Sequence, residues 1–256
     1  MKKLELFSKS LGFFSFVSLI ALLPKNANAV TIQLQNGTAT FSQQIGGGPF
    51  IPNLAVDGDF SDLSAWAIVD GANSTSQTAV WETESNVAAG DLEISMYFLH
   101  SNPQHLLGRF RLSVTTDDRD TFADGFDVNG DVDANWIVLD NPIISGPSGM
   151  TFDILPDDSI LAGGTIPNTG TYTLNFSTGV NNITGLRLEA LEDPAISGGN
   201  SGPGFPNNGN FLLHEITLDG TPVQETVPEP TGILSLLVAA GFGVALKNKQ
   251  RGEARN

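Results

Sequence analysis

Polar and apolar residues alternate along several short segments of this chain. In residues 92–98 the even-numbered positions are all apolar, and a period of two places such positions on one face of a β-strand. The pattern therefore predicts a series of short strands, most of them amphipathic. The segments that show alternation or a short apolar run are residues 92–98, 110–114, 136–139, 150–155, 172–176, 186–190 and 211–218.

Clusters of glycine, proline, asparagine and aspartate separate these segments, as at residues 146–149 and 198–209. Such clusters are typical of turns and loops. Between residues 30 and 224 we find no stretch with the 3.6-residue period of an amphipathic helix. Many short strands without intervening helices predict an all-β domain, an antiparallel β-sandwich or jelly roll, over residues 30–224.

Residues 1–29 have the order of parts of a secretory signal peptide. Three lysines lie within the first nine residues, an apolar stretch covers residues 11–23, and small residues stand at Ala27 and Ala29, where a signal peptidase inspects the chain. The alternative is an uncleaved membrane helix, but the apolar stretch is shorter than the roughly 20 residues that span a bilayer. We therefore expect export, with Val30 as the new N-terminus.

Residues 225–256 carry a second set of ordered parts. A proline-rich motif comes first, then an apolar segment at residues 231–246, and then a basic tail at residues 247–256. The two prolines keep the motif extended and accessible, and the basic tail would hold the far side of a membrane helix in the cytoplasm. The motif consists of Val227, Pro228, Glu229 and Pro230.

This order of motif, apolar segment and basic tail resembles the PEP-CTERM sorting signal of bacteria. The resemblance covers about the last thirty residues, although the basic residues are interleaved with Asn248, Gln250 and Glu253 rather than clustered. It implies recognition by an exosortase, a membrane protease-transpeptidase that is thought to cut near the tripeptide. The protein would then be anchored in the membrane, or released to the cell surface or extracellular matrix. A plain C-terminal membrane anchor is the alternative.

The charge of the predicted domain limits its partners. Residues 30–224 contain four arginines and no lysine against 24 acidic residues, a formal net charge of −20. Such a surface repels phosphate backbones, which excludes a nucleic-acid partner, while it suits divalent cations. Cysteine is absent from the chain, so disulfides and thiol catalysis play no part.

Several short motifs carry a second resemblance, over roughly residues 37–220. An "alanine, any residue, Asp-Gly" turn at residues 55–58 is followed by Trp66, and a late strand contains Glu215. These motifs look like the discoidin or coagulation-factor C-type family of galactose-binding-like jelly rolls, although the cysteine pair of many animal members is missing. Family members that bind sugar do so with loops at one end of the barrel, and none of those loops aligns here.

The same resemblance implies a structural calcium ion, as in many bacterial members. Its ligands would be Asp57, Asp59 and Ser64 in the early loop, and Glu215 on the last strand. Calcium binds six to eight oxygen atoms of carboxylates, hydroxyls and carbonyls, and Gly58 would allow the turn between the two aspartates. The alternative is an ordinary Asp-Gly turn and a solvated glutamate.

Residues 127–133 form a second acidic cluster with oxygen side chains at alternate positions. A full calcium loop would need a glycine at Val132 and an acid at Val138, and both are missing. This segment therefore reads as an acidic surface loop, with an irregular calcium site as the alternative.

The chain shows no motif of a known catalytic centre. Its three histidines are His100 and His105, in an expected loop, and His214, beside Glu215. We find no HExxH motif, no serine nucleophile elbow and no glycine-rich phosphate loop. The sequence therefore predicts an exported, non-catalytic module that binds carbohydrate or matrix polymer with a structural calcium ion. The alternatives are a structural component of the extracellular polymer layer and a polysaccharide hydrolase.

Overall fold

The computed structural model describes residues 29–44, 48–70, 74–123, 131–196 and 202–224. The predicted signal peptide, apart from Ala29, and the predicted sorting signal lie outside these residues, so both stay predictions. In the described part of the chain no helix is long and apolar enough to cross a membrane. The helical elements of that part are two short 3-10 helices, η1 (Pro52–Ala55) and η2 (Arg119–Thr121).

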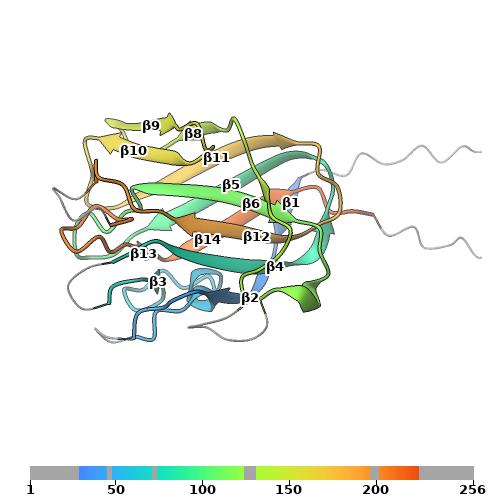
Figure 1. Cartoon of the computed structure of the whole chain (residues 1–256), viewed down its shortest axis with the longest axis horizontal. Coiled ribbons are helices and arrows are strands. Elements are labelled where there is room, and N and C mark those ends of the chain that lie inside the picture. Colours follow the sequence, from blue (N-terminus) through green and yellow to red (C-terminus); the bar gives the residue numbers. More distant parts are fainter. Residues whose placement is uncertain (1–28, 45–47, 71–73, 124–130, 197–201, 225–256) are drawn as a thin grey trace, which may run out of the picture.

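Two antiparallel sheets pack face to face as a β-sandwich (Figure 1). The first sheet has five strands, in the order β1 (Val30–Ile32), β14 (Glu215–Gly220), β5 (Gly90–Phe98), β11 (Gly170–Thr178) and β8 (Ile143–Ser145).

The second sheet has seven strands, and β7 (Ile137–Val138) lies beside β6 off the main order. The main order is β2 (Leu34–Ala39), β4 (Gln77–Val87), β12 (Ile183–Ala190), β6 (Arg109–Thr115), β10 (Ile160–Gly164) and β9 (Met150–Ile154). A short pair, β13 (Leu212–Leu213) and β3 (Trp66–Ala67), lies beside these sheets.

The alternating segments form strands as predicted, and their apolar faces meet in one core. On β5 the four even-numbered apolar residues are at most 1% exposed, and the alternating residues of β6, β11 and β12 are also buried. Burial of a large apolar side chain stabilises a fold by roughly 1.5–3 kcal/mol. The aromatic centre of the core includes Tyr172, whose hydroxyl donates to the Leu107 carbonyl at 3.0 Å. The all-β prediction is confirmed.

The eleven-residue strand β4 was not predicted, because it does not alternate. Residues 79–83 are all buried, since the outer face of β4 is covered as well as the inner one. Val80 packs with Phe122 and Ala123, and Trp136 packs against this cluster. The loop between β6 and β7 therefore shields the outer face of the larger sheet.

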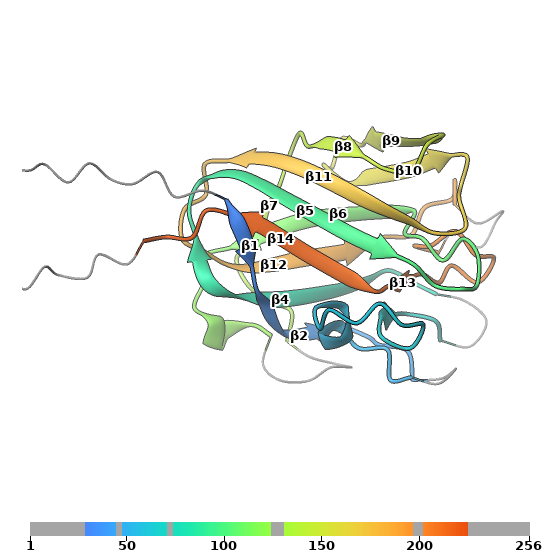
Figure 2. The same ribbon diagram turned by 180° about the vertical axis from the view of Figure 1, so that it is seen from behind.

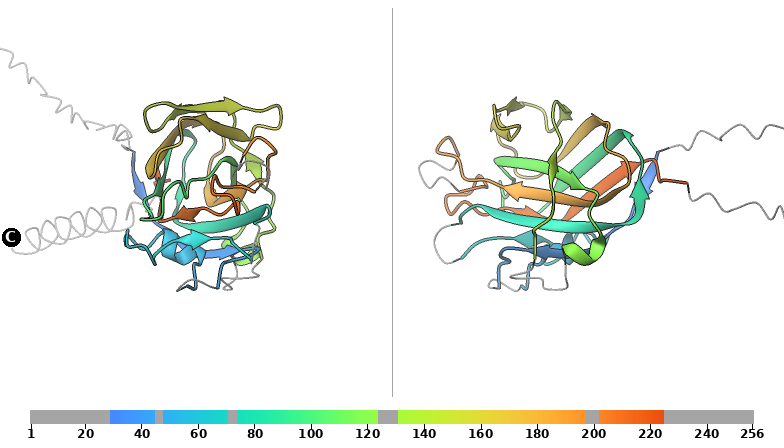
Figure 3. Two further views of the ribbon diagram at one scale, coloured as in Figure 1. Left: turned by 90° about the vertical axis from the view of Figure 1, so that its left-hand side faces the viewer. Right: turned by 45° about the vertical axis from the view of Figure 1, so that its right-hand side comes forward.

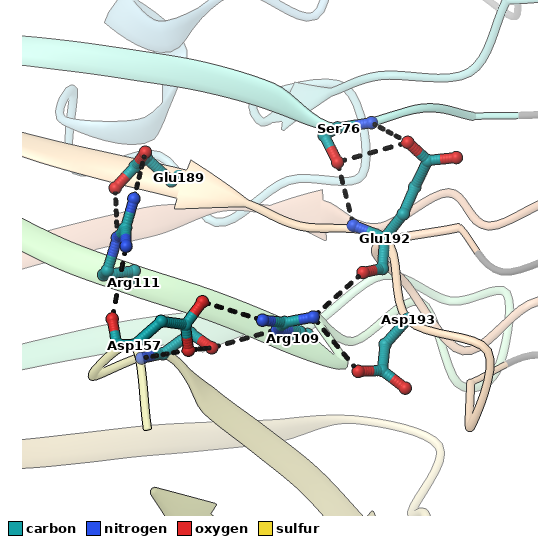
Figure 4. A network of polar contacts seen from close by, with 8 residues as sticks. Ser76, Arg109, Arg111, Asp157, Glu189, Glu192 and Asp193 are labelled. Carbon is teal, nitrogen blue, oxygen red and sulfur yellow. Dashed lines mark hydrogen bonds and ion pairs between the residues drawn. The ribbon is translucent and has the colours of Figure 1, made fainter. Parts of the chain in front are cut away.

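All four arginines of the domain belong to the larger sheet or to the loop that covers it. Arg111 makes a two-pronged ion pair with Glu189 on the neighbouring strand, at 2.7 and 3.0 Å, and Arg109 bridges Asp157 and Asp193 (Figure 4). Arg187 bonds Ser113 and Glu189, and Arg119 bonds backbone and side-chain oxygens of β4. The five-stranded sheet consequently carries no arginine or lysine.

Both ends of the domain leave the sandwich at the same end. Val30 on β1 pairs with Gly220 on β14, and Figures 2 and 3 show the two chain exits side by side. The first described strand begins at Val30 and the last ends at Gly220. A protein of residues 30–224 therefore contains the whole described core. At the opposite end, residues 48–65, 99–108 and 202–211 come together, and we call this the loop end.

Candidate functional site

The structure brings Asp57, Ser64 and Glu215 together at the loop end. The Ser64 hydroxyl donates to Asp57 Oδ2 at 2.7 Å and lies 3.3 Å from the Leu54 carbonyl. Glu215 begins β14, and its Oε2 accepts the Gly58 amide at 3.1 Å. Gly58 has a φ of 75°, which a residue with a side chain rarely adopts, so the Asp-Gly turn needs glycine here.

Asp59 is placed differently from the other three predicted ligands. Its carboxylate accepts the amide and the hydroxyl of Ser61, at 2.9 and 3.1 Å, in an exposed turn. Within the described ranges no group of three or more histidine or acidic side chains is gathered closely enough to hold a metal ion. The oxygen atoms that do converge are two carboxylates, one hydroxyl and one backbone carbonyl.

Glu215 is only 8% exposed, although it is a carboxylate beside a second carboxylate. Burial and the charge of Asp57 raise the pKa of Glu215 to about 7, and the Gly58 amide offsets part of this rise. Two facing carboxylates with an unfavourable interaction are what a divalent cation would neutralise. The donor set, all oxygen and doubly acidic, fits calcium rather than a metal that prefers nitrogen or sulfur.

The second acidic cluster is only partly described, because residues 124–130 lie outside the described ranges. Asp117 accepts the amide and the side chain of Asn135, and Asp131 Oδ1 accepts the Asp133 amide. These carboxylates are therefore used within the loop, and the partial calcium site at residues 127–133 stays a prediction.

The three histidines of the chain form a cluster at the loop end that the sequence did not reveal. The ring of His100 lies 5.3 Å from that of His105 and 6.1 Å from that of His214, between centroids. His214 is fully buried, whereas the other two are half-buried. No local pattern could have found this cluster, because His214 is more than a hundred residues away and only the pairing of β14 with β5 brings it close.

Three exposed apolar residues lie in the two loops beside the histidines, and we call them the apolar patch. Phe60, Leu63 and Leu99 are 46%, 58% and 37% exposed, and the Phe60 ring packs edge-on against Tyr97 at 5.5 Å. The Asp62 carboxylate joins the two loops that carry the patch, since it accepts both the amide and the hydroxyl of Ser101. These bonds hold the pKa of Asp62 below its usual value. The patch is therefore apolar, flanked by polar groups, and open to solvent.

Two shallow hollows lie elsewhere, on the outer face of the five-stranded sheet. They have volumes of about 440 and 470 Å³, and Asp91 and Asn175 line both. Asp91, Glu93 and Asp219 make this face acidic. Neither hollow is lined by a histidine, and both lie toward the end where the chain exits. They are therefore separate from the convergent groups of the loop end.

Comparison with known proteins finds no matching protein family and no matching curated protein. Solved structures that are similar include a CBM32 module of Clostridium perfringens in complex with GalNAc-β-1,3-galactose, with a TM-score of 0.43, 14% identity and coverage of 74% of this chain and 99% of that one. The family 32 carbohydrate-binding module of Clostridium perfringens NanJ, in complex with galactose, has a TM-score of 0.36 and 9% identity. The match covers 75% of this chain and 99% of that one. The C-terminal domain of a Bacteroides fragilis chitobiase has a TM-score of 0.44 and 11% identity, and the match covers 76% of this chain and 100% of that one. Such low values assign neither a ligand nor an activity to this chain.

Proposed function

We propose that this protein is an exported, non-catalytic module that binds carbohydrate through its loop end. The observation that carries the proposal is the exposure of Phe60, Leu63 and Leu99 beside polar side chains. The loops that carry these residues lie at the end opposite both chain exits (Figure 2). Sugars present apolar C–H faces and ring hydroxyls, so they need an apolar surface with a few placed polar groups. The patch and its neighbours supply both.

The direction of the chain exits supports display at the cell surface. If the tail beyond Gln224 anchors the protein in the membrane before or after sorting, the exit end faces the membrane and the loop end faces outward. An exosortase-type protease would act on the motif that begins three residues after Gln224. The galactose-binding-like jelly roll that the motifs imply is in accord with this arrangement.

A calcium ion would be held by Asp57, Ser64 and Glu215, with the Leu54 carbonyl beside them. When bound, it would neutralise the two carboxylates and so join the loop of residues 54–64 to β14. Because Phe60 and Leu63 lie in that loop, the calcium-mediated link to β14 would also fix the position of the apolar patch. Calcium would thus act as a structural ion for the binding surface, without a catalytic role.

The test is a glycan array followed by calorimetry on residues 30–224, in calcium and in chelator. We expect binding of at least one polysaccharide, and loss of that binding in Phe60→Ala. Ser177→Ala, on the far part of β11, is the matched control and should bind normally. If no glycan binds the wild-type protein in calcium, the proposed function is wrong.

A structural role in the extracellular polymer layer is a second candidate, favoured by the acidic face of Asp91, Glu93 and Asp219. Divalent cations bridge acidic surfaces, so this role requires calcium-dependent self-association. Light scattering in millimolar calcium measures it directly. A strict monomer under those conditions would count against this candidate.

A further inference from the structure

Backbone amides of the loop after β5 determine which nitrogen of two histidines carries the proton. The Asn102 amide donates to His100 Nδ1 at 3.0 Å, and the Leu99 amide donates to His214 Nδ1 at 3.2 Å. A ring nitrogen that accepts a hydrogen bond carries no hydrogen, so the hydrogen of each neutral ring is on Nε2. His100 and His214 are therefore donors at Nε2.

His105 has the opposite arrangement. Its Nδ1 lies 3.2 Å from the carbonyl oxygens of Asn102 and Pro103, and carbonyl oxygens can only accept. The hydrogen of neutral His105 is therefore on Nδ1, and its Nε2 has a free lone pair. Burial lowers the pKa of His105, which favours this neutral form. His100 and His105 thus form an adjacent donor and acceptor, with ring centroids 5.3 Å apart.

Beneath this pair lies one of three buried side-chain polar atoms that lack a hydrogen-bond partner in the described part of the chain; the other two are Ser74 Oγ and Arg187 Nε. His214 is fully buried, and its Nε2 makes no hydrogen bond. A buried donor without a partner destabilises the unliganded cluster. The Nε2 atoms of His100 and His105 also have no hydrogen-bond partner among the described residues, and both rings are half-buried and reachable.

We propose that His100 and His105 recognise two neighbouring hydroxyl groups of an uncharged sugar, one that accepts from His100 Nε2 and one that donates to His105 Nε2. This inference rests on the proposed function and specifies its ligand. A hydroxyl group both donates and accepts, so a pair of them matches a donor next to an acceptor. A transition-metal ion fits less well, because it needs a lone pair on every ligand nitrogen, and Nε2 of two of the three rings carries a hydrogen.

The charges around the pair exclude acidic sugars. Asp62 is the ionised group nearest the histidines, and Asp57 and Asp59 lie in the same loop. The arginines are engaged on the other sheet, so no basic side chain of the described residues faces the cluster. Uronic acids and sulfated sugars would meet uncompensated negative charge here, whereas neutral hexoses would not.

Asparagine and glutamine substitutions separate two functions of each ring, the hydrogen bond of Nδ1 to the loop backbone and the proposed contact of Nε2 with the sugar. In His100→Asn the side-chain oxygen occupies the position of Nδ1 and still accepts the Asn102 amide, as in an Asx turn. In His105→Asn the side-chain amide still donates to the same carbonyls. The double variant H100N/H105N therefore keeps the loop but lacks both Nε2 atoms. His100→Gln does the reverse, because its amide reaches the Nε2 position and leaves the Asn102 amide without its acceptor.

The experiment uses residues 30–224, with circular dichroism to verify folding. At neutral pH, long-range ¹H–¹⁵N spectra should show hydrogen on Nε2 of His100 and on Nδ1 of His105. Dextran, galactan and mannan serve as neutral probes and polygalacturonate as the acidic probe. We expect a neutral probe to shift both Nε2 signals, and H100N/H105N to lose affinity by about tenfold or more with an unchanged melting temperature.

Four outcomes would overturn the inference, and only the last of them also affects the proposed function. Reversed protonation of His105 in the spectra refutes it without any ligand. Unchanged affinity of H100N/H105N for a neutral glycan that binds the wild type refutes the inference and leaves carbohydrate binding intact. Tighter binding of polygalacturonate than of the neutral glycans by the wild type has the same consequence. Absence of any glycan binding by the wild type removes both.

Discussion

Replacing Glu215 by glutamine should stabilise the calcium-free protein at alkaline pH. The pKa of Glu215 is raised from 4.5 to about 7 by burial and by Asp57, so the folded state holds this proton more tightly than the unfolded state. The resulting contribution to stability is fully present below about pH 4.5 and is lost as the pH rises to about 7. Glutamine cannot ionise, and its side-chain oxygen can still accept the Gly58 amide.

The magnitude follows from the size of the pKa shift. Each pKa unit corresponds to about 1.4 kcal/mol, so ionisation of Glu215 should cost the folded state roughly 3 kcal/mol at pH 8. Between pH 5 and pH 8 the free energy of unfolding of the wild type should thus fall by up to about 3 kcal/mol more than that of Glu215→Gln. This difference is a large part of the free energy of unfolding of a whole domain, which is typically about 5–15 kcal/mol.

The assay is urea unfolding of residues 30–224 in chelator at pH 5 and pH 8. Glu84→Gln removes an exposed carboxylate of β4 and is the matched control, which should follow the wild-type pH profile. Added calcium should stabilise the wild type at pH 8 and have much less effect on Glu215→Gln. Identical pH profiles of Glu215→Gln and the wild type would refute the account of Glu215 as a buried, repelled carboxylate.

Three further results test the site and the core. Asp57→Ala should abolish the rise in melting temperature that calcium causes in the wild type, and an equal rise in the variant would remove Asp57 from the site. Tyr172→Phe should lower the free energy of unfolding by about 1–2 kcal/mol, because the buried Leu107 carbonyl loses its donor, and urea titration measures this. Phe60→Ala should weaken glycan binding in calorimetry without destabilising the fold, since Phe60 is exposed; an unchanged affinity would move the binding surface elsewhere.

Strands β5 and β11 could be predicted from the sequence because one face of each is toward solvent. On β5 and β11 apolar residues alternate with polar ones because the outer face of the five-stranded sheet is open. On β4 the rule fails, because Phe122 and Trp136 cover its outer face and remove the need for polar residues there. Residues 211–218 were predicted as one run, but they divide at His214 into β13 and β14, which belong to different sheets.

The candidate site divides in a similar way. Asp57, Ser64 and Glu215 were predicted as ligands through a family resemblance, and the structure places all three around the Asp-Gly turn, with Asp59 directed at Ser61. The sequence does not indicate that Phe60 is exposed or that it contacts Tyr97, because both depend on how its loop packs against β5. Such contacts depend on how loops from different strands meet.

By itself, the sequence determined the all-β class, the acidic charge and the absence of disulfides, because these depend on local alternation and on composition. Only the tertiary structure decided that His100, His105 and His214 form one cluster. The register of β14 on β5 places Glu215 opposite Tyr97, and this brings His214 within reach of the Leu99 amide. Strand register results from packing of the whole core, so no short segment of the sequence contains it.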